Sequence, residues 1–133
     1  MATTTATLTL SSSDLTGDAL SLTTTATLTK AGVTTGLDQT TGVSRKSFAT
    51  AQTAYNLIAA ADYTADKAHK LYIKNTSTTA AEFITVEVGA TNLSLGRLYA
   101  GDWMLVPYDG NNDIDIDTSA VNMTVEYMVI YEA

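Results

Sequence analysis

Residues 121–131 read Val-Asn-Met-Thr-Val-Glu-Tyr-Met-Val-Ile-Tyr, and this alternation of side chains predicts a β-strand. Successive side chains on a strand point to opposite sides, so one face of this strand would be buried and the other wet. The heptamer Thr-Thr-Thr-Ala-Thr-Leu-Thr occurs twice, at residues 3–9 and 23–29, with the same alternation. Both ends of the chain therefore predict an all-β protein.

The same pattern continues between the two ends. We expect strands at 3–10, 19–30, 43–49, 70–75, 82–88, 92–98, 103–106, 113–118 and 121–131. Residues 54–60 fit either a strand or a helix, and we favour the strand. Residues 31–42 are expected to form a loop, and residues 61–69 a loop or a single helical turn. Pro107 ends its strand or marks an edge, because proline has no N–H to give to a neighbouring strand.

Some eight or nine short strands predict an antiparallel β-sandwich or jelly roll of about eight strands, because two packed sheets cover the apolar faces that one open sheet would leave exposed. We expect one domain over residues 1–133, since no Pro/Gly-rich linker divides the chain. Residues 1–30 are Thr-rich and form either N-terminal strands of the sandwich or an arm. Ala6, Leu8 and Leu10 are predicted to point inward. The repeated heptamer reflects convergence on one strand pattern or a duplicated pair of strands.

The composition of the chain argues against several classes of function and site. The formal net charge is −7, which repels a phosphate backbone and argues against general nucleic-acid binding. The chain has no Cys, so neither disulfides nor thiolate metal sites are possible. We expect a soluble protein without a signal peptide or membrane span, because no N-terminal or internal segment has the required apolar run.

No motif predicts catalysis or cofactor binding. His69 is the sole histidine and lies in a polar stretch, without a Ser-centred elbow motif anywhere in the chain. No Gly-rich phosphate loop is present. We therefore expect no enzyme activity and no cofactor, and we expect His69 to be a surface or hydrogen-bonding residue.

One run of acidic residues is a candidate metal-binding site. It contains Asp109, Asp113, Asp115 and Asp117, whose oxygens suit a hard cation such as calcium, but it lacks the Gly and Glu of an EF-hand loop. Strand alternation explains the run more simply, with Ile114 and Ile116 in the core and the aspartates on the solvent face. A contact with a basic partner and a weak calcium site remain the alternatives.

Five residues are candidates for an interface. Arg45 and Lys46 form the only basic doublet. Trp103 is expected in the core or at a subunit interface, with ligand contact as the alternative. Met128 and Ile130 make the last strand apolar on both faces, so either another part of the chain or another subunit is expected to cover them.

Three segments resemble small virion structural proteins of tailed bacteriophages. They are Leu71–Asn75 (Leu-Tyr-Ile-Lys-Asn), 96–101 (Gly-Arg-Leu-Tyr-Ala-Gly) and the closing 125–131, so the resemblance covers mainly residues 70–133. It implies a jelly-roll or β-sandwich subunit that decorates or cements a capsid, usually as a trimer or other homo-oligomer. No catalytic residues come with this family.

The resulting expectation is a non-enzymatic capsid decoration or cement protein that bridges neighbouring subunits. Its partners would be the major capsid protein or other virion subunits, with no nucleic acid and no membrane. It would be made in the host cytoplasm and reside on the capsid surface of the virion. The alternative is a phage tail, fibre or carbohydrate-binding β-sandwich module, in which Trp103 and tyrosines would face the ligand.

Overall fold

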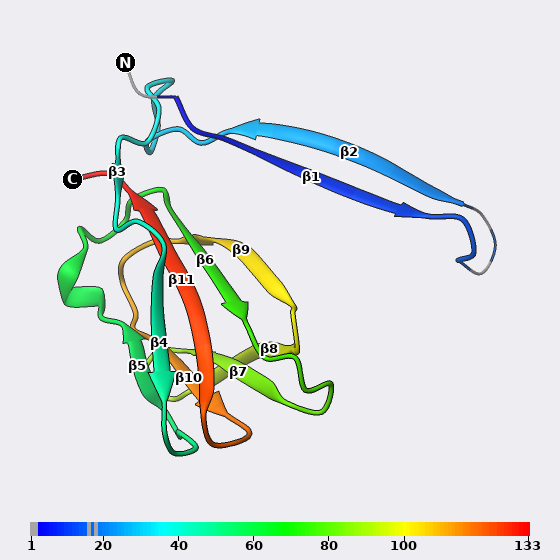
Figure 1. Cartoon of the computed structure of the whole chain (residues 1–133). Helices are drawn as coiled ribbons and strands as arrows, with labels where there is room; N and C mark the ends of the chain where they lie inside the picture. Colours follow the sequence, from blue (N-terminus) through cyan, green and yellow to red (C-terminus); the bar gives the residue numbers. More distant parts are fainter. Residues whose placement is uncertain (1–2, 16, 18) are drawn as a thin grey trace.

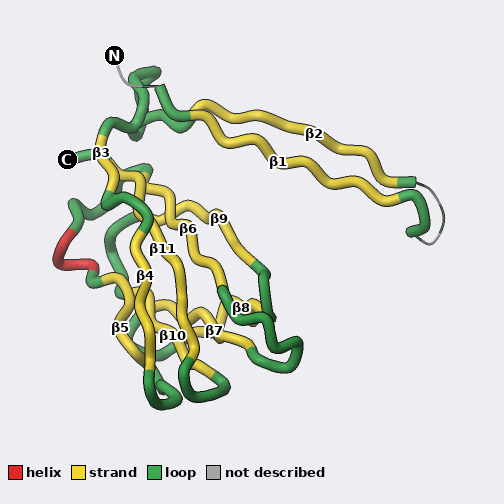
Figure 2. The backbone as a smooth tube through the Cα atoms, viewed as in Figure 1, coloured by secondary structure: helices red, strands yellow, loops and turns green. Residues whose placement is uncertain are grey.

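The computed structural model describes residues 3–15, 17 and 19–133, and the regular secondary structure of these residues is almost entirely β-strand (Figures 1 and 2). The strands are β1 (Thr5–Ser12), β2 (Leu20–Thr27), β3 (Gln39–Thr40), β4 (Ser44–Phe48), β5 (Tyr55–Ile58), β6 (His69–Asn75), β7 (Phe83–Val88), β8 (Leu93–Tyr99), β9 (Trp103–Tyr108), β10 (Ile114–Thr118) and β11 (Met123–Tyr131). One short 3₁₀ turn, η1 (Ala60–Asp62), follows β5. Within the described ranges, no helix is long and apolar enough to cross a membrane.

Two antiparallel sheets form the body of the molecule. One has the strand order β5-β10-β7-β8. In the other, β11 pairs with β6, β6 pairs with β9, and both β3 and β4 pair with the free side of β11. The predicted antiparallel β-sandwich is confirmed.

The core lies between these sheets and follows the expected alternation. Along β6 every second residue is fully buried, and Leu71 and Ile73 have no exposed surface. Along β10, Ile114 and Ile116 are buried, while the alternating Asp115 and Asp117 are only partly buried on the other face. The remaining buried apolar residues of this core are Phe48, Leu57, Ile58, Ile84, Val86, Tyr108, Met123, Val125 and Val129. Burial of alternate side chains is therefore what holds the two layers together.

The observed strands lie close to the predicted ones. Residues 55–58 form a strand rather than a helix, and residues 60–62 make the single helical turn. Pro107 lies in β9, which is an edge strand of its sheet, so the missing N–H interrupts no ladder between two neighbours. Thr16 and Asp18, which lie between the first two predicted strands, fall outside the described residues.

The N-terminal strands do not join the sandwich. β1 and β2 pair only with each other and form a hairpin that extends away from the two sheets (Figure 1). The prediction that Leu8 and Leu10 point into the core is wrong, because more than a third of each side chain is exposed. Alternation fixes which residues share a face, but it does not say whether a second layer covers that face.

This division between body and hairpin predicts different costs for the same substitution. Leu71→Ala removes a fully buried side chain and should lower the free energy of unfolding by about 2–5 kcal/mol. Leu10→Ala, at a side chain that is 42% exposed, should change it by about 0.5 kcal/mol or less. Urea denaturation of dilute protein measures both. Equal losses would mean that the hairpin packs on the body in solution.

Candidate interaction surfaces

The hairpin of β1 and β2, here called the arm, has two chemically different faces. Cross-strand register places Leu10 opposite Leu22 and Ala6 opposite Ala26 on one face. The other face is a ladder of hydroxyls, in which the Oγ1 atoms of Thr7 and Thr25 lie 2.9 Å apart. The two copies of the repeated heptamer lie antiparallel, so that Thr faces Thr on the hydroxyl face. On the other face Ala6 lies opposite Ala26 and Leu8 lies opposite Thr24.

The apolar face of the arm is uncovered. Its large side chains are exposed by 37% to 44% and are called the leucine stripe: Leu8, Leu10, Leu20 and Leu22. An isolated two-stranded hairpin is at best marginally stable in water, since nothing covers its apolar side. The stripe is therefore a candidate contact surface.

The root of the arm, in contrast, is firmly attached. The Leu28 N–H donates to the Thr4 carbonyl oxygen at 2.8 Å, and the Leu37 N–H donates to the Leu28 carbonyl oxygen at 2.9 Å. Leu28 and Leu37 are both buried. These contacts close the base of the hairpin and direct it away from the body.

Glu132 joins this root to the sandwich. Its Oε1 accepts hydrogen bonds from the N–H groups of Ala31 (3.2 Å) and Ala68 (3.1 Å). Burial alone would raise the pKa of Glu132, but the two N–H donors and nearby Lys67 outweigh burial and lower the pKa. The ionised carboxylate thus ties a residue just after the arm to a residue just before β6.

Met128 and Ile130 lie beside the same root. They are half-buried and line a cavity of about 280 Å³ together with Leu37 and the segment Asp38–Thr40. The chain itself thus partly covers the second apolar face of β11.

A second uncovered apolar surface lies along β8 and β9. Each strand ends its sheet, and the two are consecutive in the chain, so they lie on the same side of the sandwich (Figure 1). We call this side of the sandwich the open edge, and its exposed apolar side chains are Leu93, Leu95, Tyr99, Trp103 and Leu105. Leu93 lies opposite Val88 and Leu95 lines the space between the sheets, whereas Tyr99 faces outward from one sheet and Trp103 and Leu105 face outward from the other. Trp103 is 52% exposed, so the expectation that it lies in the core is wrong, while its interface and ligand roles are not decided by this exposure.

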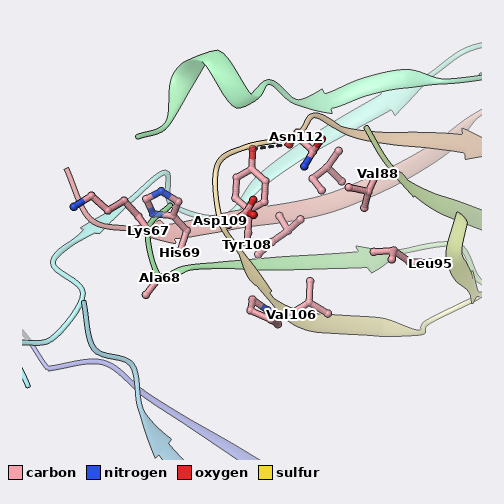
Figure 3. A pocket seen from close by; sticks show the side chains of 12 residues that line it. Lys67, Ala68, His69, Val88, Leu95, Val106, Tyr108, Asp109 and Asn112 are labelled. Carbon is pink, nitrogen blue, oxygen red and sulfur yellow. Dashed lines mark hydrogen bonds between the residues drawn. The ribbon is translucent and has the colours of Figure 1, made fainter. Parts of the chain in front are cut away.

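A cavity of about 510 Å³ opens between the sheets at this edge (Figure 3). Its apolar lining comes from both layers: Leu71, Val88, Leu95, Val106, Pro107 and Ile114. Lys67, His69 and Asp109 line the polar end. Tyr108 donates its hydroxyl proton to the Asn112 carbonyl oxygen at 3.0 Å, and burial, aided by nearby Tyr63 and Asp113, raises the pKa of Tyr108 to about 12.

His69 is a buried structural residue. Its Nε2 lies 2.9 Å from the Thr64 carbonyl oxygen, and its Nδ1 accepts the Glu132 N–H at 3.3 Å, which assigns the neutral Nε2–H tautomer. Gly110 allows this packing: its φ is +78°, and a Cβ there would lie 2.7 Å from the Thr64 carbonyl oxygen. His69 satisfies its hydrogen bonds with backbone groups, as the sequence prediction allowed.

The basic doublet does not form one patch. The Arg45 guanidinium lies 2.9 Å from a carboxylate oxygen of Glu126 on the neighbouring strand, and it lowers the pKa of Glu126. The Lys46 ammonium lies 5.5 Å from the centroid of the Tyr55 ring. Arg45 and Lys46 are neighbours on a strand, so they point to opposite sides of it.

The aspartates of the acidic run serve several local roles. Asp113 and Asp117 accept the backbone N–H groups of Ala60 (2.8 Å) and Ala54 (2.7 Å), which fixes both ends of β5. Asp109 accepts the Asn111 N–H at 2.9 Å. Among the residues that the structure describes, no three or more His, Cys, Asp or Glu side chains form a group that could hold a metal ion.

Asp115 differs from its neighbours in this run. Its Oδ1 is buried and has no hydrogen-bond partner, and the residue lies directly opposite Glu87 on β7. Burial, with a smaller effect of Asp113, raises the pKa of Asp115. Burial also raises the pKa of Glu87, with Asp117 and Asp115 adding to the shift. This pair of like charges destabilises the fold when both carboxyls are ionised.

Asp115→Asn should therefore stabilise the protein at neutral pH. A carboxyl whose pKa is raised by folding stabilises the native state when protonated, and this contribution is lost as pH rises through the folded pKa. Removing the charge should raise the unfolding free energy by roughly 0.2–1 kcal/mol at pH 7. The gain should vanish near pH 3, where Asp115 is protonated in both states.

Asp62→Asn is the matched control, because it changes the net charge equally at an exposed residue of η1. Thermal melting over a pH series compares the two variants. A loss of stability in Asp115→Asn at pH 7 would contradict the assigned repulsion.

The sequence patterns predicted the strands that carry the leucine stripe and Leu93 and Leu95, but they gave no signal that these side chains are uncovered. That information depends on where each strand lies in its sheet. No protein-family model, no curated protein and no solved structure matches this chain.

Proposed function

We propose that this chain is a non-enzymatic virion structural protein that decorates or cements a tailed-phage capsid by bridging neighbouring subunits. The proposal begins from the sequence resemblance and is supported by the surfaces described above. After synthesis in the host cytoplasm, the protein would act at the capsid surface. Its partners would be the major capsid protein or other virion subunits.

The arm is the observation that carries this proposal. Its root is held by backbone hydrogen bonds and by Glu132, while its leucine stripe contacts nothing in the described chain that would bury it. Apolar contact with a neighbouring subunit would remove the stripe from water and stabilise the hairpin. A repeated lattice would add many such contacts, so that weak single interfaces would combine into firm attachment.

The strand order supports the jelly-roll form of the sandwich that the resemblance implies. The two sheets consist of the eight strands β4 to β11 and the two-residue strand β3. Each link between consecutive strands crosses to the other sheet, except the link from β7 to β8. This alternation is typical of a double-sheet jelly roll.

A particle experiment tests this function. Phage particles would be purified from cultures that carry the coding sequence in its natural genome, and gold-labelled antibody against the recombinant chain should decorate their heads. Particles from a deletion strain should release DNA at a lower temperature, and added wild-type protein should restore the release temperature because it bridges subunits.

Two arm variants sharpen this test. Leu10→Asp places a charge in the leucine stripe and should abolish the restoration, whereas Thr9→Asp places the same charge on the hydroxyl face and should retain it. A chain found only in the soluble fraction, with unlabelled particles, would refute the proposed function.

One observation favours the alternative, a tail, fibre or carbohydrate-binding module. Trp103 is half exposed and lies beside Leu105, which is also exposed, on the side of β9 that faces away from the core. Exposed aromatic rings of this kind offer a flat apolar platform to a sugar ring.

Because Trp103 is the only tryptophan, its fluorescence reports directly on such binding. Titration with host-surface polysaccharide should leave the emission spectrum unchanged if the capsid role is correct. A saturable spectral shift, lost in a Trp103→Leu variant that no longer binds polysaccharide in a pull-down, would favour the alternative.

A further inference from the structure

We infer that the leucine stripe of one copy covers the open edge of a second copy of this chain. The inference rests on the proposed role of the arm in joining subunits and identifies the surface that receives it. Of the 13 large apolar side chains that are exposed in the described chain, four belong to the stripe and five to the open edge. Uncovered apolar surface is thus concentrated on two regions of one molecule.

The arm cannot reach the open edge of its own body in the observed conformation. Its root is closed by the Leu28–Thr4 and Leu37–Leu28 backbone hydrogen bonds and is tied to the sandwich through Glu132. From there the arm extends into solvent (Figure 2). A second copy supplies the same open edge without any change in this root.

The charge distribution favours contact between these two regions. The whole chain carries a net charge of −7, so two copies repel each other over most approaches. The strands of the arm contain no charged residue, and β8 and β9 contain only Arg97. The guanidinium carbon of Arg97 lies 4.2 Å from the centroid of the Phe83 ring, so this cation already makes a cation–π contact within its own chain. The arm and the open edge can therefore meet without bringing acidic strands together.

The two regions also have similar lengths. The eight residues of β1 span about 26 Å and the seven residues of β8 about 23 Å, at roughly 3.3 Å per residue. The 510 Å³ cavity at the open edge has an apolar lining that suits leucine side chains. β8 and β9 each have one unpaired backbone edge, so hydrogen bonds to an added strand can supplement the apolar contact.

The contact is heterologous, because the donor surface differs from the receiving surface. Each copy gives one arm and receives one, and such a contact closes into a ring when the rotation between copies permits it. This arrangement differs from arms that pack stripe against stripe, in which the open edge would take no part.

Sedimentation velocity of the purified full chain over a concentration series tests the inference. The wild type should self-associate. Leu10→Asp in the arm and Leu95→Asp at the open edge should each weaken association more than about tenfold, because each would bury an unpaired carboxylate. Thr9→Asp and Val121→Asp are the matched controls: Thr9 lies on the opposite face of the arm, and Val121, at 55% exposure against 53% for Leu95, lies in the loop before β11. Both controls should associate like the wild type.

Mixing the two defective variants is the decisive step. Leu95→Asp keeps an intact arm and Leu10→Asp keeps an intact open edge, so a mixture should form a one-to-one heterodimer. Each variant must first show a cooperative melting transition, and Leu95→Ser replaces Leu95→Asp if that variant is unfolded. A monomeric wild type, normal association of Leu95→Asp, or a mixture that stays monomeric would overturn the inference.

These outcomes separate the inference from the proposed function. A monomeric wild type that still labels and stabilises phage heads would refute only the contact between copies and would assign the arm to another shell protein. Self-association of a chain that is absent from particles would refute only the capsid role.

Discussion

Apolar contact between the two sheets is the interaction on which the rest of the structure depends. A strand with one apolar face is stable only when a second layer covers that face. Most of the strands from β4 to β11 satisfy this condition within the chain, with Leu71, Ile73 and Ile116 fully buried between the layers, whereas β8 is largely exposed. β1 and β2 have the same alternation and no second layer, so the same physical rule that builds the body leaves the arm incomplete.

The polar contacts hold the body together and attach the root of the arm to it. Asp113 and Asp117 hold the ends of β5 through backbone N–H groups, and His69 and Glu132 connect the last residues of the chain to the segment before β6. Glu132 also reaches Ala31, just beyond the arm. Hydrogen bonds therefore hold the root on the body, while the leucine stripe stays exposed. Such an arrangement suits an arm that contacts a neighbour at a defined angle.

Much of the sandwich was predictable from sequence, because alternation is a local property. The Ile-Asp repeat of 113–118 gave the correct inward residues. The pattern of 121–131 gave Met123, Val125 and Val129 correctly, but Val121 at its start is 55% exposed. Leu8 and Leu10 were misassigned, since an inward face can be recognised from sequence but a missing second layer cannot. Trp103 does not lie in the core, and its interface or ligand role stays a prediction. The open edge was equally hidden, because the positions of β8 and β9 at the ends of their sheets follow from long-range pairing. The buried state of His69 depends on Thr64, Gly110 and Glu132 together, which no spacing in the sequence indicates.

Hydrogen–deuterium exchange of the wild-type chain tests the central claim most directly, since it reports on the arm without any substitution. If only a neighbouring molecule covers the stripe, amides of β1 and β2 should exchange rapidly in dilute protein and become protected as concentration rises, while amides of β6 and β11 stay protected throughout. Protection of the arm that is strong in dilute protein and independent of concentration would contradict the account, because it would mean that the chain covers its own stripe.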